Sequence, residues 1–492
     1  MNCDDWEKGL NNTIIENNLN KHACKIRIPK ICPFKLGKYF LDLSKLKNLK
    51  CEEMKVNAKL ILFKYSKSKY INKNTQSIGI PLFSADNKTF KAFKDNSHIL
   101  NKYFESNLVD VDNKNLLKKL YKNKNPEIII DFKNKKYGEL KINIDYDKKL
   151  SQDRKILEKN SSPYSSNIIV IYIDSVSRAN SIRKLKKTLK FIEQFMNFNG
   201  GYNSKYPSEK YHSFQFFKYH SFTSYTRNNY LQIFYGNNFG NKENKNYIRI
   251  TKYFKENGYI TCFVNDMCMR EPTNTMHNMN IEEIADYEFL NCDPNMKSVH
   301  SHTKRCLYNK ISTEFIYEYG NKFWRAYSKN RKFMILATND GHEGTLEVIK
   351  YIDNSLFNFL NNLYNDILFS NSTIFLLSDH GTAAPSPYYI YDFYQIERHL
   401  PMLYLIVNDR KDITYNLQYE FIYKNQQILI TGYDIYNTFS HLMLGDKYNK
   451  IKNKTNLKDS PKTNLGISLF NKNNSKDRSP KNYIKMNLNI CK

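Results

Sequence analysis

The chain has 492 residues, of which 41% are hydrophobic and 25% charged, and its formal net charge is +28 at pH 7. This length suits one large domain with an accessory region. The 31 Phe and 38 Tyr residues exclude a chain that is disordered throughout. No apolar stretch approaches the ~18–20 residues that span a bilayer, so we expect no transmembrane helix.

The positive charge is carried mainly by Lys residues which, like the abundant Asn residues, occur in every segment. This even spread indicates a solvated, lysine-rich surface. The sequence has no Arg-rich arm, RNP motif or zinc-finger spacing, so we expect no nucleic-acid partner. The alternative is that the charge attracts anionic partners or substrates.

The nine cysteines form an N-terminal group and a group within residues 262–306, with one left over, and no CxxC pair occurs. The lack of CxxC argues against a structural zinc site. Two groups of four favour disulfides, at least one of them in the second group, and a secretory or extracellular location. The alternative is buried thiols in a cytoplasmic protein, since residues 1–9 show no apolar signal segment. The cysteines are Cys3, Cys24, Cys32, Cys51, Cys262, Cys268, Cys292, Cys306 and Cys491.

Residues 1–160 are polar and contain short β-like runs separated by Asn and Lys clusters, which predicts a small β-rich accessory region. The stretch SSPYSS at 161–166 is the clearest linker. Residues 446–492 are rich in Lys, Asn and Ser, and we expect a poorly ordered C-terminal tail there. The β-like runs are Leu60–Tyr65, Ile78–Phe83, Glu127–Asp131 and Tyr137–Ile144.

Residues 161–445 alternate apolar strand-like runs with amphipathic helical segments. Asn167–Asp174 and Thr373–Ser378 are continuous apolar runs, typical of parallel strands buried on both faces. The alternation predicts an α/β fold with a doubly wound, mostly parallel sheet sandwiched by helices. The other expected strands are Tyr259–Asn265, Lys332–Thr338 and Pro401–Val407, and the expected helices are Leu185–Asn197, Asn229–Phe234, Leu346–Phe369 and Tyr433–Leu444.

Carboxylate and imidazole side chains follow three of the expected strands. A single Asp after a strand is often only a helix N-cap, but three strand ends with ligand-type residues are harder to attribute to chance. The carboxyl ends of parallel strands meet at one edge of the sheet. Mixed oxygen and nitrogen ligands there predict a site for a divalent ion such as zinc or manganese. The residues are Asp174, Asp340, His342, Asp379 and His380.

Thr226 opens the helix expected around Asn229–Phe234. A hydroxyl is a poor nucleophile unless a metal ion or a base activates it. The start of a helix adds backbone donors for an oxyanion, and Arg178 and Arg227 are candidates to clamp a phosphate or sulfate. The alternative is that Thr226 is only the N-cap of its helix, a role that is compatible with chemistry.

Several motifs in this order carry a resemblance to a known family. They are IDSVSR at 173–178, a K-T-L-F-E-like helix, T-x-x-N before a Gly, G-Y-x-T, D-G-H-E-G-T, L-L-S-D-H-G and E-R-x-L-P. The chain resembles the uncharacterised DUF229 family, which is similar to the wider alkaline phosphatase/sulfatase superfamily. The resemblance covers roughly residues 165–445, with weaker similarity at Cys24–Phe34. It implies the α/β fold of that superfamily.

The resemblance also implies roles for individual residues. Asp174, Asp379 and His380 match metal ligands, Thr226 stands where the nucleophile that contacts the metal is found, and Asn229 takes the place of the Asn that follows it. Asp340 and His342 fall where relatives bind a second ion, although the D-x-H spacing is tighter here. The last His of the relatives has no convincing counterpart. His399 and His441 are the nearby candidates, and either is more typical of an ordinary surface or core histidine.

These features predict a metal-dependent hydrolase or transferase that acts on phosphate esters, in preference to sulfate esters, through Thr226. One or two divalent ions (Zn, Mn, Mg or Ca) are implied, and one is favoured, in which case His342 faces the substrate. The expected substrate is an anionic small molecule, lipid or glycan ester. The C-x-P-S-R motif of true sulfatases is absent. The alternative is an inactive fold that binds anionic glycans or lipid head groups.

Overall fold

The structure is a computed structural model. It describes residues 146–195, 211–236, 249–266, 310–343, 346–366, 372–382, 397–408, 421–451 and 461–472, apart from 427 and 464. It also describes residue 144 and the backbone of short strands at 61–63, 76–80, 128–131, 139–142, 287–291 and 306–307.

The centre of the fold is a sheet made of β2 (Gln76–Ile80), β5 (Asn167–Ile173), β6 (Tyr211–Gln215), β7 (Ile260–Asn265), β8 (Tyr287–Asn291), β11 (Lys332–Thr338), β12 (Ser372–Leu377) and β13 (Leu403–Asn408). Their order in space is β2-β8-β7-β11-β5-β12-β13-β6. Within this sheet β13 is antiparallel to both of its neighbours, and the other adjacent pairs are parallel. The prediction of a mostly parallel sheet is therefore confirmed.

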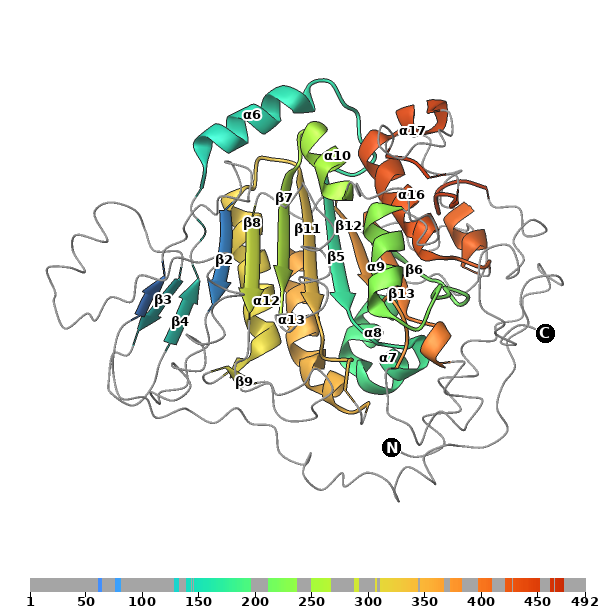
Figure 1. The fold of residues 1–492 in the computed structure, drawn as a ribbon, viewed down its shortest axis with the longest axis horizontal. Coiled ribbons are helices and arrows are strands. Elements are labelled where there is room, and N and C mark those ends of the chain that lie inside the picture. Colours follow the sequence, from blue (N-terminus) through green and yellow to red (C-terminus); the bar gives the residue numbers. More distant parts are fainter. Residues whose placement is uncertain are drawn as a thin grey trace, which may run out of the picture.

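Helices cover both faces of the sheet (Figure 1). They are α7 (Arg178–Lys184), α8 (Lys186–Glu193), α9 (Thr226–Tyr235), α10 (Ile250–Glu256), α12 (Ser312–Ala326), the 3-10 helix η2 (Val348–Ile352), α13 (Asp353–Asn365) and α16 (Gly432–Leu444). Ile169 and Ile171 of β5 pack in one hydrophobic cluster with α8, α12 and α13, whereas Ile168 and Val170 pack in another with α9, α10 and α16. Successive side chains of a strand point to opposite faces, so a strand that is apolar at every position needs a helical layer on each side.

Part of the N-terminal region belongs to the main sheet. The strands β1 (Ile61–Phe63), β3 (Ile128–Asp131) and β4 (Glu139–Ile142) form a separate antiparallel sheet, but β2 pairs with β8. A short hairpin of β9 (Cys306–Leu307) and β10 (Lys310–Ile311) precedes α12. The helix α6 (Lys148–Glu158) lies across the amino edge of the main sheet (Figure 1). The division into regions 1–160, 161–445 and 446–492 stays a prediction.

The C-terminal region contains a stretch that packs on α16. After the short helix α17 (Lys447–Lys450), residues 461–472 run along α16. Nδ2 of Asn437 donates to the carbonyl oxygen atoms of Thr463 (2.9 Å) and Gly466 (2.6 Å). Leu469 and Phe470 are buried in the cluster on that face of the sheet. The expectation of a poorly ordered tail is wrong for this stretch, because its apolar residues complete the core over α16.

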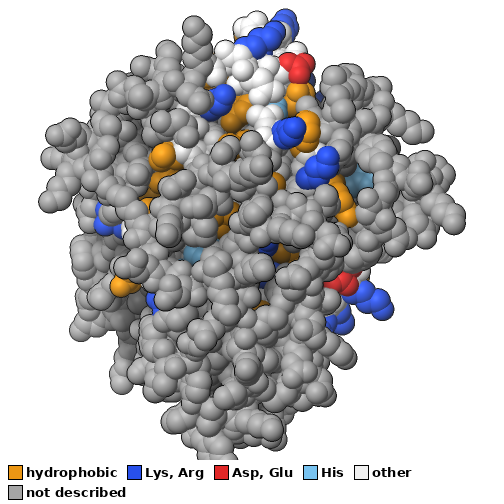
Figure 2. All heavy atoms as spheres, turned by 90° about the vertical axis from the view of Figure 1, so that its right-hand side faces the viewer, with side chains coloured by type: hydrophobic (Ala, Val, Ile, Leu, Met, Phe, Trp, Pro, Cys, Tyr) orange, Lys and Arg blue, Asp and Glu red, His pale blue; other side chains and the backbone are white. Residues whose placement is uncertain are grey.

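The surface and the cysteines bear on location and partners. Figure 2 shows Lys and Arg side chains scattered over the described part of one face, in agreement with the even spread seen in the sequence. None of the described helices is both long enough and apolar enough to cross a membrane.

Cys262 is buried in β7, and the side chains of the other cysteines in its group lie outside the described residues. The disulfides and the secretory location stay predictions.

Candidate active site

The loop that follows β5 carries Asp174, whose carboxylate is buried. The next residue, Ser175, has a positive φ of 62°, a conformation that costs a non-glycine residue about 1–2 kcal/mol. Its N–H donates to Oδ1 of Asp379 (3.3 Å), and its hydroxyl donates to Oδ1 of Asp174 (3.0 Å). Ser175 thus ties the end of β5 to the end of the neighbouring strand β12 and brings the two carboxylates together.

His380 follows Asp379 in the turn after β12, and both side chains are buried. Nδ1 of His380 lies 2.7 Å from the carbonyl oxygen of Gly381. A carbonyl only accepts, so Nδ1 carries the proton and the lone pair of Nε2 faces the site. Nε2 lies 3.4 Å from Oδ2 of Asp379 and 3.7 Å from Oδ1 of Asp174.

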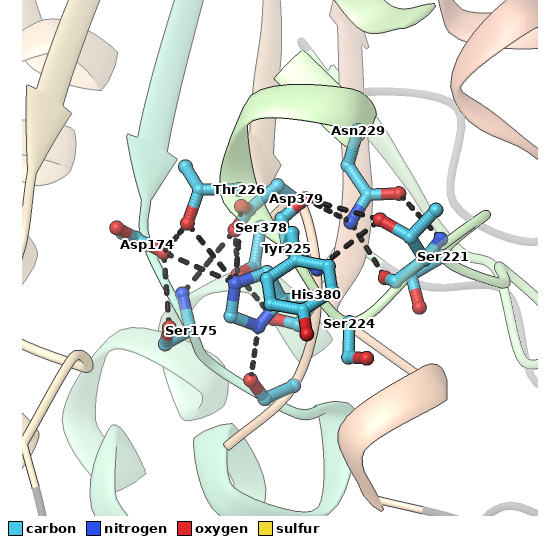
Figure 3. A network of polar contacts seen from close by, with 12 residues as sticks. Asp174, Ser175, Ser221, Ser224, Tyr225, Thr226, Asn229, Ser378, Asp379 and His380 are labelled. Carbon is cyan, nitrogen blue, oxygen red and sulfur yellow. Dashed lines mark hydrogen bonds and ion pairs between the residues drawn. The ribbon is translucent and has the colours of Figure 1, made fainter. Parts of the chain in front are cut away.

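Thr226 is the first residue of α9, and its side chain points at the same cluster (Figure 3). Its Oγ1 lies 3.1 Å from Nε2 of His380 and donates to Oδ1 of Asp174 at 3.4 Å. The N-cap of α9 is Tyr225, so the alternative that Thr226 is only an N-cap is wrong. The structure brings together the residues on which the predicted mechanism depends, namely Asp174, Thr226, Asp379 and His380.

The loop after β11 brings His342 to this cluster but directs Asp340 elsewhere. Ligand atoms of Asp174, His342 and His380 all lie within 4.8 Å of one another. Asp340 is not in that group, and its Oδ2 accepts a hydrogen bond from the hydroxyl of Thr313 on α12 (2.6 Å). This arrangement does not support the predicted pairing of Asp340 with His342 as ligands of a second ion.

Arg178 opens α7, and its side chain is buried. Its guanidinium carbon lies 4.6 Å from the ring centroid of Phe217. With the amide of Gln215 oriented to place its oxygen toward Arg178, that oxygen accepts from Nε and Nη2 at 2.8 Å each. Burial lowers the pKa of Arg178 to about 10. These contacts lie at the β6 edge of the sheet and do not favour the predicted role as an anion clamp, which stays a prediction.

Asn229 acts on the backbone of the loop that precedes Thr226. Its Oδ1 accepts from the N–H groups of Phe222 (2.9 Å) and Thr223 (3.1 Å). Its Nδ2 donates to the carbonyl oxygen atoms of Thr223 (2.8 Å) and Tyr225 (3.1 Å). All four hydrogen-bonding positions of the amide are used, so Asn229 is a positioning residue for this loop.

The two candidates for the last histidine differ in their surroundings. Nδ1 of His399 lies 3.0 Å from Oγ of Ser221, in the loop before α9, and burial lowers the pKa of His399 to about 3. His441 lies on α16, where its ring stacks on Tyr448 with centroids 4.5 Å apart. His441 is therefore a core histidine, whereas His399 borders the site.

One segment, residues 397–402, contacts three of the segments that carry the site, a role that the E-R-x-L-P motif at 397–401 does not by itself reveal. Its carbonyl oxygen atoms accept hydrogen bonds from the loop after β5 (3.0 Å), from the loop before α9 (3.0 Å) and from the turn after β12 (2.7 Å). Glu397 forms a buried ion pair with Arg183 of α7, which anchors the segment. The acceptors are Leu400, His399 and Arg398, in that order.

Replacing Gly381 with Ala should destabilise the fold by about 3 kcal/mol or more. A Cβ at this position would lie 1.6 Å from the carbonyl oxygen of Glu397, so the backbone of segment 397–402 would have to move. The matched control is Gly320→Ala in α12, where a Cβ meets only the ends of flexible side chains, Leu336 at 3.1 Å and Met334 at 3.3 Å, and gains helix propensity. Urea unfolding should show a large loss for Gly381→Ala and a change within about 1 kcal/mol for the control. Equal changes in stability for the two variants would contradict the close approach of Gly381 to segment 397–402.

The paired histidines His220 and His399 should make the fold less stable in acid. Their rings stack with centroids 5.6 Å apart, and burial lowers the pKa of His220 to about 4 and of His399 to about 3. Unfolded histidine titrates near ~6.5, so between about pH 6.5 and 4 the unfolded chain binds protons that the folded chain does not. Stability should therefore fall as the pH falls through this window. His220→Gln should show a shallower fall in urea unfolding, and an unchanged slope would refute the assignment.

The residues present fit a divalent cation. Burial, and then the neighbouring Asp379, raise the pKa of Asp174 well above its ordinary value, as expected for two buried carboxylates that lie close together. Oδ2 of Asp379 is buried and accepts no hydrogen bond from any residue that the structure describes. The set of carboxylate oxygen, imidazole nitrogen and hydroxyl oxygen is one that zinc and manganese accept. A cation held by Asp174, Asp379 and His380, with Thr226 beside it, would satisfy these atoms.

Several solved structures are similar to this chain. The C-terminal periplasmic domain of EptC from Escherichia coli, in complex with zinc, has 11% identity and a TM-score of 0.40, with 58% of this chain and 84% of that chain covered. The lipoteichoic acid synthase LtaP from Listeria monocytogenes has 13% identity and a TM-score of 0.41, with 66% and 82% covered. A protein of the alkaline phosphatase superfamily from Vibrio parahaemolyticus has 13% identity and a TM-score of 0.36, with 60% and 74% covered.

The sequence comparisons concern the family. No curated protein matches the chain. The model of one family, described as "Protein of unknown function (DUF229)", matches residues 41–492. The match includes the motifs that carry Asp174, Thr226, Asp379 and His380. The chain therefore belongs to the DUF229 family.

Proposed function

We propose that the protein is a metal-dependent hydrolase or transferase of phosphate esters, with Thr226 as its nucleophile. The observation that carries the proposal is the position of the Thr226 hydroxyl, 3.1 Å from Nε2 of His380 and 3.4 Å from Oδ1 of Asp174 at the start of a helix. A nucleophile needs a group that withdraws or accepts its proton, and an oxyanion needs donors nearby. Both requirements are met around this one oxygen atom.

The residues divide the chemistry between them. A bound cation would lower the pKa of the Thr226 hydroxyl and offset negative charge on the ester. The O–H of Thr226 is directed at Oδ1 of Asp174, which takes up the proton as Oγ1 attacks phosphorus. The bond from phosphorus to the leaving oxygen breaks, and the leaving oxygen takes a proton from water or from His342 as general acid. Water, or an acceptor alcohol in a transferase, then attacks phosphorus and releases Thr226.

Two features help to hold the charged group. The first N–H groups of α9 have no partners within the helix and attract an anion at the position where the reaction takes place. His342 borders the same pocket, and in a one-ion site it faces the substrate as an anion contact or a general acid. We favour one ion because Oδ2 of Asp340, the other predicted ligand of a second ion, accepts a hydrogen bond from the hydroxyl of Thr313.

Turnover of three probes tests the proposal, with p-nitrophenyl phosphate, bis-p-nitrophenyl phosphate and p-nitrophenyl sulfate each assayed before and after chelation and metal return. We expect a phosphate probe to be hydrolysed, the chelated protein to be inactive, and elemental analysis to find about one ion per chain. Turnover of p-nitrophenyl sulfate alone would show that the enzyme acts on sulfate esters instead of phosphate esters. No turnover by metal-loaded protein would refute the proposal in favour of a binding protein. Two ions per chain, one of them lost in His342→Ala, would refute the one-ion site.

A further inference from the structure

The residue before Thr226 carries an exposed aromatic ring. Tyr225 is 65% exposed, although it lies between the half-buried Ser224 and Thr226. Figure 3 shows its ring projecting from the loop before α9, across the imidazole of His380 in that view. A large ring left in water at the mouth of a buried polar cluster has no role in the core. It is placed to meet whatever enters the site.

The backbone of Tyr225 is held firmly while its ring has no partner within the part of the chain that the structure describes. The carbonyl oxygen accepts hydrogen bonds from Nδ2 of Asn229 (3.1 Å) and Oγ1 of Thr223 (3.2 Å), and the N–H donates to Oγ1 of Thr223 (3.1 Å). The side chain makes no hydrogen bond and no ring contact among the described residues, and it does not cap α9. Because the backbone of Tyr225 is already fixed, little conformational entropy is lost when its ring binds a ligand. Tyr225 therefore suits a preformed binding site.

Exposed large hydrophobic side chains are rare in the described part of the chain. The others are Tyr146 and Ile156, which lie just before and within α6, across the amino edge of the sheet. Tyr225 is at the opposite, carboxyl edge, where the site is. The exposed ring therefore belongs to the site and is not part of a general apolar surface.

We propose that Tyr225 is a substrate-binding residue that stacks on a sugar ring of the ester whose phosphate reacts at Thr226. This inference rests on the proposed function and names its substrate class. A sugar presents an apolar C–H face to an aromatic ring and hydroxyl groups at its edge, which suits an amphipathic Tyr with polar neighbours. Those neighbours are Ser224, the exposed Arg227 and the Arg398 guanidinium, whose Nη2 donates to the carbonyl oxygen of Ser224 (3.1 Å). An acyl chain would need a wider apolar surface than this single ring.

The experiment compares phosphate release from three probes by the metal-loaded full chain: glucose 6-phosphate, glycerol 3-phosphate and hexyl phosphate. Tyr225→Ala should raise KM for glucose 6-phosphate about tenfold, the size of one aromatic contact, and leave kcat within about twofold. KM for glycerol 3-phosphate should not change. Tyr225→Phe should stay within about threefold of the unmodified protein, because the ring is kept. Tyr146→Ala is the matched control, since that ring is also exposed but lies at the other edge, and it should change nothing.

Each other outcome overturns the inference in a recognisable way. Equal KM increases for all three probes would mean that Tyr225 shapes the loop and does not contact the sugar. An increase confined to hexyl phosphate would assign the ring to an acyl chain. Turnover of glucose 6-phosphate with no effect of Tyr225→Ala would overturn this inference and leave the proposed function intact. No turnover of any probe by the unmodified protein would overturn the proposed function, and this inference with it.

Discussion

Replacing Thr226 with Val should lower kcat by about 10⁴-fold or more while the fold is kept. Val has nearly the shape of Thr, and the N-cap position of α9 belongs to Tyr225, so the substitution removes the hydroxyl and little else. That hydroxyl is the one that contacts both His380 and Asp174. Steady-state turnover of p-nitrophenyl phosphate measures the loss, and urea unfolding checks that the variant is folded.

The conservative variant Thr226→Ser separates a chemical role from a packing role. It keeps an oxygen at the same branch point, so it should retain a measurable fraction of the activity that Thr226→Val loses. If Thr226→Val retained turnover within about tenfold of the unmodified protein, the nucleophile would have to be another group. Equal activity of the Val and Ser variants would lead to the same conclusion.

Replacing Asp379 with Asn should remove the metal ion and lower turnover by about 10³-fold. The substitution keeps the shape of the side chain but cancels the charge of a buried carboxylate whose Oδ2 accepts no hydrogen bond from the described residues. A neutral amide is a much poorer ligand for a divalent cation, and loss of the ion raises the barrier by several kcal/mol. Elemental analysis should fall from about one ion per chain to well below one.

The matched control for Asp379→Asn is Asp353→Asn. Asp353 is also a buried carboxylate, but its oxygen atoms accept from the N–H groups of Lys187 and Thr188 at the start of α8. Its role is structural, so Asp353→Asn should lower stability and leave the metal content unchanged. A metal content that is the same in the unmodified protein and in Asp379→Asn would show that Asp379 is not a ligand.

The strands that the sequence predicts well are those buried on both faces. The run at 168–173 is apolar at every position, and the run at 333–337 is too, and each forms a strand as expected. Tyr211–Gln215 reads YHSFQ, with no β-branched residue, and becomes a strand because it pairs with β13 at the edge of the sheet. Whether such a segment forms a strand depends on the strand that pairs with it, and its own β propensity does not reveal that pairing.

In the site, too, some features could be predicted from the sequence and others could not. The ends of parallel strands fix where Asp174, Asp379 and His380 meet, and this could be predicted because topology alone sets it. The direction of a long or tethered side chain depends on its neighbours. Asp340 bonds to a Thr on α12, a helix that is not among those expected from the sequence, and the side chain of Arg178 is buried against the ring of Phe217.

The central claim is that a divalent cation sits between Asp174, Asp379 and His380 beside Thr226. Anomalous X-ray diffraction from crystals grown with saturating zinc or manganese tests it most directly. We predict a peak about 2.0–2.2 Å from oxygen atoms of both carboxylates and from Nε2 of His380, with Oγ1 of Thr226 directed at it. Crystals grown in this way with no peak at these residues, or with a peak only elsewhere in the protein, would contradict the account.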